Sequence, residues 1–255
     1  MELVDTHCHL DLEAFDPDRR QVLERARARG VQRMLVPAVD AAHWDGLLQL
    51  CRTEEALYPA LGLHPVFLQQ HTAADILALE GAVEEHRPVA VGEIGLDYLV
   101  PGLDREQQQA LFEAQLETAR AAGLPVILHV RKAHDQVIST LKRIPVSGGT
   151  VHAFNGSLQQ AQRYLDMGFR LGFGGTLTYP RSTRIRKLAA ALPMDAIVLE
   201  TDAPDMVVAA HQGERNSPEY LPDCLQALAE VRDAAPDELA LHTTRNARDV
   251  FSLDA

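Results

Sequence analysis

Short apolar runs alternate with longer amphipathic stretches along this chain, and the alternation repeats eight times. The apolar runs predict strands at residues 3–4, 34–36, 58–63, 89–91, 126–128, 149–151, 169–173 and 197–199. The amphipathic stretches predict helices at residues 19–29, 43–55, 76–85, 105–122, 135–143, 158–167, 183–191, 222–233 and 237–251. Strands that are apolar throughout and alternate with helices are typical of a parallel sheet covered on both faces.

Eight strand–helix units within 255 residues favour a (β/α)8 TIM barrel, an α/β fold, as one domain over residues 1–255. A doubly wound open sheet is the alternative. Its dinucleotide-binding form requires glycines spaced as GxGxxG, and Gly172, Gly174 and Gly175 do not have that spacing. The barrel is therefore the fold that the pattern favours.

Composition narrows the class of protein. Apolar residues make up 46% of the chain and charged residues 24%, which is the balance of a globular domain. No apolar run approaches the roughly 18 residues that span a bilayer, so we expect no membrane partner. Cys8, Cys51 and Cys224 are too few and too far apart to predict a disulfide framework. Because residues 1–5 lack the basic start of a signal peptide, we expect a cytoplasmic protein.

The net charge of −12 argues against a protein that coats nucleic acid through a broad basic face. It does not exclude a site whose positive charge comes from bound cations. Basic residues are locally dense at Arg181, Arg184, Arg186 and Lys187, and we interpret that run as the solvated face of a helix. No segment predicts a subunit interface, so a monomer is the default expectation.

Polar side chains that bear chemistry follow six of the eight predicted strands. His7 and His9 lie two residues apart, so an extended backbone points both imidazoles to one side. The other residues that end apolar runs are His64, Glu93, His129, His152, Glu200 and Asp202. Each alone is typical of a structural histidine or a helix cap. Together they indicate one site, because TIM barrels gather their active-site residues at the carboxyl ends of the strands.

The number of predicted ligands points to two metal ions. Four histidines and two carboxylates are too many for one tetrahedral site. They suit two divalent ions with a bridging carboxylate, for which Glu93 lies midway in the strand order. Zn²⁺, Mn²⁺, Co²⁺ and Mg²⁺ all remain candidates, since imidazole and carboxylate do not select sharply among them. The predicted ligands are His7, His9, Glu93, His129, His152 and Asp202.

The predicted chemistry is hydrolysis. Two ions lower the pKa of a shared water and produce hydroxide near neutral pH. Asp202 is placed both to bind a metal and to accept the proton from that water. Arg131 lies two residues after His129, so it points to the same side and can pair with a phosphoryl oxygen. A salt bridge to Glu93 or Asp97 is the equally weighted alternative for Arg131.

The motifs resemble the TatD family of metal-dependent hydrolases. They run from Asp5-Thr6-His7-Cys8-His9 through Gly62-Leu63-His64-Pro65, Gly92-Glu93-Ile94-Gly95-Leu96-Asp97, His129-Val130-Arg131 and His152-Ala153-Phe154 to Leu199-Glu200-Thr201-Asp202-Ala203-Pro204. The resemblance implies an amidohydrolase-type barrel and places His7, His9 and Asp202 on one ion. It places His129 and His152 on the other ion, with Glu93 between them. Many members are described as deoxyribonucleases, including 3′ exonucleases.

Two departures from the family pattern bear on the substrate. Ala153 and Asn155 stand where the family more often has Cys and Ser, and Asp205-Met206 stand where nuclease-like members tend to have an aromatic residue. These features resemble the YjjV-type subgroup. They leave the predicted ligands unchanged, but they weaken the inference from the family that the substrate is DNA.

Three functional hypotheses follow. The first is a phosphodiesterase acting on DNA or a small phosphate-containing substrate, with Arg131 and His64 contacting phosphate oxygens and Tyr98 and Tyr179 stacking on bases. His64 can equally be structural, and the tyrosines can simply pack. The second is a carbon-centred hydrolase such as an amidase, lactonase or deacylase, which the acidic charge slightly favours. The third is a non-catalytic, metal-dependent binding module. The pattern favours it least, because binding alone does not require ligands from so many strands.

Overall fold

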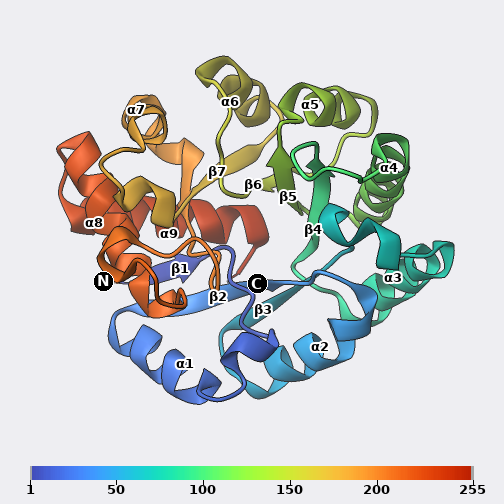
Figure 1. Ribbon diagram of the computed structural model, residues 1–255, viewed down its shortest axis with the longest axis horizontal. Helices are drawn as coiled ribbons and strands as arrows, with labels where there is room; N and C mark the ends of the chain where they lie inside the picture. Colours follow the sequence, from blue (N-terminus) through green and yellow to red (C-terminus); the bar gives the residue numbers. More distant parts are fainter. Residues whose placement is uncertain (1, 254–255) are drawn as a thin grey trace.

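A computed structural model describes residues 2–253 and shows a nearly closed barrel of eight parallel strands (Figure 1). Each strand pairs with the next in chain order, from β1 to β8, and helices surround the sheet. The strands are β1 (Leu3–Asp5), β2 (Val31–Pro37), β3 (Leu57–Leu61), β4 (Ala90–Asp97), β5 (Val126–Arg131), β6 (Gly149–Val151), β7 (Phe169–Phe173) and β8 (Ile197–Leu199). The predicted TIM barrel is confirmed.

The helices follow the predicted alternation. They are α1 (Arg19–Ala28), α2 (Trp44–Thr53), α3 (Ala73–His86), α4 (Arg105–Ala122), α5 (His134–Arg143), α6 (Leu158–Leu165), α7 (Thr183–Ala191), α8 (Leu221–Arg232) and α9 (Pro236–Phe251). The ends of α4 show why its limits were readable from the sequence. Asp104 accepts a hydrogen bond from the Gln107 amide, and Gly123 ends the helix with a φ of 68°.

Three strands extend by three or more residues beyond their predicted apolar runs, and one of them, β5, continues to Arg131. β2 begins at Val31 because the polar residues Gln32 and Arg33 take part in the strand, and its register with β1 shifts between Val31 and Arg33. β4 continues through Glu93 to Asp97, and every residue of that strand is buried. A buried carboxylate inside a strand breaks the apolar pattern, which is why the sequence predicted a strand only as far as Val91.

The barrel closes between its first and last strands through hydrogen bonds at their carboxyl ends. The Thr6 amide and hydroxyl both donate to the Leu199 carbonyl at 3.0 Å, and the Asp202 amide donates to the His7 carbonyl at 2.8 Å. Asp5 reinforces this closure, because its buried carboxylate accepts from the Thr201 amide at 2.9 Å and the Thr201 hydroxyl at 2.5 Å. The closure therefore holds the first and last predicted ligands side by side.

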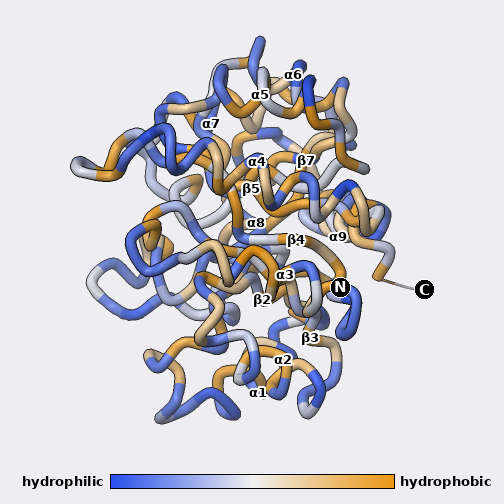
Figure 2. Tube along the Cα trace, turned by 90° about the vertical axis from the view of Figure 1, so that its right-hand side faces the viewer, coloured by the Kyte–Doolittle hydropathy of each residue, from blue (hydrophilic) through white to orange (hydrophobic). Residues whose placement is uncertain are grey.

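Helix α9 covers the opposite end of the barrel. Ala247, Phe251 and Leu253 pack against an interior cluster of strand residues, namely Val4, Leu35, Ala60, Ala90, Ile127 and Val198. Figure 2 shows the hydrophobic residues concentrated in the strands, with hydrophilic residues on the outer turns. Because α9 covers the amino ends of the strands, the carboxyl ends are left to form the site.

Other sequence expectations concern membranes and disulfides. Within residues 2–253, no helix combines the length and apolar character needed to cross a bilayer. Cys8, Cys51 and Cys224 are free thiols, as their spacing predicted.

Replacing Phe251 with alanine tests the closing role of α9. Phe251 is buried, so its loss should lower the free energy of unfolding by about 3–5 kcal/mol through lost burial and a cavity. Leu241→Ala on the same helix is the matched control, because Leu241 is 70% exposed and its loss should cost within about 0.5 kcal/mol. Urea unfolding of both variants measures the difference. Equal midpoints would contradict this role of α9.

Candidate metal centre

The predicted site residues line one cavity of about 640 Å³ at the carboxyl ends of the strands. Its wall includes His9, His64, Glu93, His129, Arg131, His152 and Asp202, with His7 buried directly beneath. These residues come from six different strand ends, as the sequence pattern predicted. The closed barrel brings them together.

Four ligand atoms form a first cluster around His7. The His7 Nε2 atom lies 3.1 Å from His9 Nε2, 3.1 Å from a Glu93 carboxylate oxygen (Oε2) and 3.6 Å from Asp202 Oδ1. His9 Nε2 lies 3.5 Å from Glu93 Oε2 and 3.6 Å from Asp202 Oδ1. Bonds of about 2.1 Å to a tetrahedral metal place ligand atoms about 3.4 Å apart. The cluster therefore has the dimensions of a metal site.

A second cluster uses the other oxygen of the same glutamate. Glu93 Oε1 lies 2.9 Å from His129 Nδ1 and 3.3 Å from His64 Nε2, and these two nitrogens are 3.1 Å apart. Glu93 thus presents Oε2 to the first cluster and Oε1 to the second. This is the arrangement required of a bridging carboxylate.

Glu93 is almost completely buried, and its ionisation depends on its neighbours. Burial acts to raise the pKa of this carboxyl. His64 and His7 oppose burial, and with the hydrogen bond from His129 they hold the pKa of Glu93 well below its usual range. A negatively charged bridge between two clusters of nitrogen and oxygen atoms suits two cations better than none.

His152 lies between the two clusters. Its ring stacks on His7 with centroids 3.8 Å apart, whereas its centroid is 6.4 Å from that of His129. Its Nε2 lies 3.6 Å from Asp202 Oδ2, and its Nδ1 lies 3.0 Å from Glu200 Oε1. Burial lowers the pKa of His152, but Glu200 and Asp202 outweigh burial and raise it to about 10. The expected pairing of His152 with His129 remains a prediction.

Outer hydrogen bonds orient two of the other predicted ligands. His9 directs its Nδ1 to the Pro37 carbonyl at 3.0 Å, and His129 directs its Nε2 to Asp97 Oδ2 at 3.0 Å. Asp97 is itself fixed, because its other oxygen accepts from the amides of Leu99 and Val100. Such a partner keeps a proton on the outer nitrogen, so the opposite nitrogen of the ring can give up its proton and bind a metal. For His129 that nitrogen is Nδ1, which faces Glu93.

His64 has the opposite arrangement. Its Nδ1 accepts a hydrogen bond from the Val66 amide at 3.1 Å, so a neutral ring carries its proton on Nε2. Burial lowers the pKa of His64 to about 4, which keeps the ring neutral near pH 7. The Nε2 atom that His64 contributes to the second cluster is therefore an N–H donor while the ring is neutral, although the same atom also has the position of a ligand.

Three buried carboxylates support the barrel closure or the predicted ligands, a role that was not predicted for them from the sequence. They are Asp5 at the barrel closure, Asp97 behind His129 and Glu200 behind His152. Gly172 makes room for Glu200, because a Cβ there would lie 2.1 Å from Glu200 Oε2. Asp5 and Glu200 directly follow predicted apolar runs, which was the available signal for them, whereas Asp97 lies six residues beyond the run that ends at Val91.

Of the predicted substrate contacts, His64 and Arg131 line the cavity, whereas Tyr98 and Tyr179 are not among its lining residues. Arg131 is half-exposed, and its guanidinium lies 3.5 Å from Asp97 Oδ2, so both roles expected for it are compatible with its position. Tyr98 lies beneath the guanidinium of Arg105 at 4.4 Å. The Tyr179 hydroxyl donates to the Val207 carbonyl.

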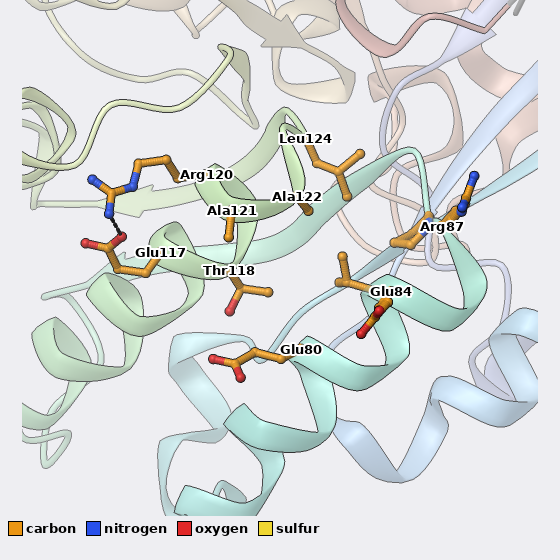
Figure 3. Close-up of a pocket in the computed structure, with 11 residues that line it drawn as sticks. Glu80, Glu84, Arg87, Glu117, Thr118, Arg120, Ala121, Ala122 and Leu124 are labelled. Atoms are coloured by element: carbon orange, nitrogen blue, oxygen red, sulfur yellow. Dashed lines mark ion pairs between the residues drawn. The ribbon is translucent and has the colours of Figure 1, made fainter.

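A larger cavity of about 920 Å³ lies elsewhere, between α3 and α4 (Figure 3). It is lined by Glu80, Glu84, Arg87, Glu117, Arg120 and Leu124, among others, and contains none of the predicted site residues. Arg87 and Leu124 come shortly before β4 and β5, so this cavity lies near the end of the barrel opposite the metal centre. The grouping of ligand atoms therefore identifies the site better than cavity size does.

Comparison with known proteins gives one consistent relationship. Residues 4–252 match the family model described as TatD related DNase. The chain is 42% identical to an Escherichia coli K12 protein named uncharacterized metal-dependent hydrolase YjjV, over 98% of each chain. It is 32% identical to the Bacillus subtilis uncharacterized metal-dependent hydrolase YabD, over 99% of this chain and all of that one.

Solved structures agree. The crystal structure of YjjV, a TatD homologue from E. coli, superposes with a TM-score of 0.95 at 42% identity, over 98% of each chain. A TatD family hydrolase from Entamoeba histolytica has a TM-score of 0.87 at 18% identity, again over 98% of each chain, which shows a shared fold.

Asp97→Asn tests the orienting role of the carboxylate behind His129. The amide removes the negative charge and should weaken one of two bound ions by about 10–100-fold while leaving the other unchanged. Calorimetric titration with Mn²⁺ or Zn²⁺ measures both affinities. Asp195→Asn, at an exposed position, is the control. Two unchanged affinities in Asp97→Asn would contradict the orienting role.

Proposed function

Because this chain belongs to the TatD family and is a metal-dependent hydrolase, we propose that it is a phosphodiesterase that cleaves DNA from its ends, as a 3′ exonuclease does. The supporting observation is the pair of ligand clusters that share Glu93 at the floor of a 640 Å³ cavity. When bound there, two divalent ions supply Lewis acidity that neutralises a phosphate and activates water.

Asp202 is the proposed general base. Its Oδ1 belongs to the first cluster, while Oδ2 lies 3.6 Å from His152 Nε2, so the carboxylate spans the ligands and the cavity. Its side chain is 14% exposed, more than those of the neighbouring ligands, which gives a water molecule access to it. Its backbone has a φ of 60°, an uncommon conformation that aspartate tolerates better than most residues. Asp202 therefore accepts the proton of the attacking water.

His64 and Arg131 are the proposed phosphate contacts. The neutral His64 ring carries its proton on Nε2, which makes it a hydrogen-bond donor toward an oxygen in the cavity. Arg131 lies at the cavity edge and offers guanidinium N–H groups in the fork that matches phosphate oxygens. Both donate to the phosphate, and they stabilise the charge that develops on it during attack.

A carbon-centred hydrolase is the competing function. Asp205 and Met206 line the cavity, and a carboxylate there disfavours a second phosphate on that side. The same water would then attack a carbonyl instead of phosphorus. An ester and amide panel separates the two functions, because only the phosphodiesterase releases nucleotides from DNA.

Asp202→Asn tests the proposed base. Release of nucleotides from single-stranded DNA with Mg²⁺, Mn²⁺ or Zn²⁺ should fall by at least about 100-fold, since the amide cannot accept a proton. Asp195→Asn should retain the rate of the unaltered protein. Undiminished cleavage by Asp202→Asn would mean that Asp202 is not the base or that the activity belongs to a contaminant. An unaltered protein that releases no nucleotide with any of the three ions, yet hydrolyses an ester or amide, would replace the proposed function with the competing one.

A further inference from the structure

One long segment of this acidic chain has no carboxylate. The protein has 36 Asp and Glu residues, yet none lies between Asp166 and Asp195. The same segment carries five cations, which are Arg170, Arg181, Arg184, Arg186 and Lys187. Charge of one sign concentrated in this way creates a local positive field despite the net charge of −12.

The fold places part of this segment at the mouth of the metal cavity. It forms β7, the following loop and α7, and a barrel helix begins at the end where the preceding strand finishes. Thr176 and Ile185 line the cavity. Arg184, beside Ile185, donates to the backbone carbonyl of Asn155, another residue of the cavity wall.

The structure divides the basic run into two groups, which the sequence could not do. Arg186 donates to the Leu177 carbonyl at 2.9 Å and lies 3.8 Å from Glu230, so its charge is engaged within the fold. Arg181 and Arg184 are exposed. The guanidinium of Arg181 is held 5.2 Å above the Tyr179 ring, which restricts its position. Arg184 and Lys187 are exposed on α7, as expected of a solvated helix face, whereas Arg186 bonds inward and Arg181 precedes the helix.

Lys132 extends the positive charge around the mouth. It is exposed directly after β5 and lines a hollow of about 430 Å³ adjoining the cavity wall. Helices α5, α6 and α7 lie in succession around the barrel, so Lys132 and the two arginines flank the β6 loop (Figure 1). We call Lys132, Arg181 and Arg184 the basic rim.

The basic rim is not neutralised by the protein itself. In the stretch from residue 2 to 253, none of its three side chains forms an ion pair with a carboxylate. Asp135, close to Lys132 in sequence, instead pairs with Arg163 at 3.2 Å. By contrast, Arg20 and Arg25 on α1 pair with Glu24 and Glu219. The rim charges are therefore available to a ligand.

The side of the mouth formed by the ends of β8 and β1, which adjoins the β7 loop, is acidic. Asp205 lines the cavity after β8, and Asp11, which is half-buried, follows the β1 ligands. A polyanion whose phosphate sits over Glu93 is repelled from this side and attracted toward the basic rim. This uneven distribution of charge favours one path for the rest of a long substrate, which leaves the cavity across the basic rim.

We propose that the basic rim binds backbone phosphates of a single-stranded nucleic acid next to the phosphate that is cleaved. This inference rests on the proposed function and extends it to the part of the substrate outside the metal cavity. A single strand is favoured because the ligands lie at the cavity floor, where His129 is 9% exposed. A flexible strand can lower one phosphate to that depth while its neighbours stay at the rim.

The inference is tested by measuring how the Mn²⁺-loaded protein binds a fluorescein-labelled single strand of twelve thymidine nucleotides with a phosphorothioate backbone. This backbone keeps its negative charges and slows cleavage, so fluorescence anisotropy reports affinity. Each single-strand phosphate contact contributes about −0.7 to the slope of log K against log salt. Arg181→Ala/Arg184→Ala should raise Kd by about tenfold at 0.1 M salt and reduce the magnitude of the slope by about 1.4.

Two further variants control for charge and folding. Arg52→Ala/Arg245→Ala removes the same charge from exposed positions on α2 and α9, and should bind like the unaltered protein. Arg181→Lys/Arg184→Lys keeps the charge and should restore most of the affinity. The inference is overturned if the rim alanine variant matches the Arg52→Ala/Arg245→Ala control in both Kd and slope.

The two proposals fail in distinguishable ways. The proposed function is tested separately by nucleotide release from an ordinary thymidine oligonucleotide by the unaltered protein. Rim-dependent binding without release would leave the basic rim in place and reject the phosphodiesterase. Nucleotide release together with binding that does not depend on the basic rim would support the phosphodiesterase and reject the role of the rim.

Discussion

The metal centre depends on one buried carboxylate that must stay ionised. Glu93 is 1% exposed, and removing a charge from water at that depth is costly unless opposite charges or donors surround it. The protein gathers histidines on both of its oxygens, at 2.9–3.5 Å, and their presence keeps its pKa low. These histidines come from strands that are distant in sequence, so the ionised state of Glu93 requires the completed barrel. The barrel and the centre are therefore interdependent.

Support behind the ligands differs from one histidine to the next. His9 is oriented by a neutral carbonyl, His129 by the ionised Asp97 and His152 by Glu200, so the negative charge behind the ligands lies on the β5–β6 side. Burial acts to raise the pKa of Asp97, yet the bonds from His129, Val100 and Leu99 bring it to about 2. A carboxylate partner increases the basicity of its imidazole. The two clusters are thus chemically unequal although they share Glu93.

The parts of this molecule that local patterns encode were predictable from the sequence. Apolar runs predicted the eight strands, and polar residues at their ends predicted where His7, His9 and Asp202 meet, because parallel strands finish at one edge. Other features depend on long-range geometry. The proton position on His64 follows from the Val66 amide, and the burial of Asp97 within β4 follows from its neighbours. Likewise, no periodicity separates Arg186, which bonds inward, from Arg184, which lies at the mouth.

The position of α9 has a consequence for the order in which the chain matures. The predicted ligands end at Asp202, but the interior cluster beneath them is covered by Ala247 and Phe251. A nascent chain emerging from the ribosome therefore holds every ligand about fifty residues before its hydrophobic interior can be sealed. Throughout that interval the strand interior is open to water and to other chains. Packing of α9 then covers this interior, so the strands that carry the predicted ligands are protected from other chains only after the last helix has folded.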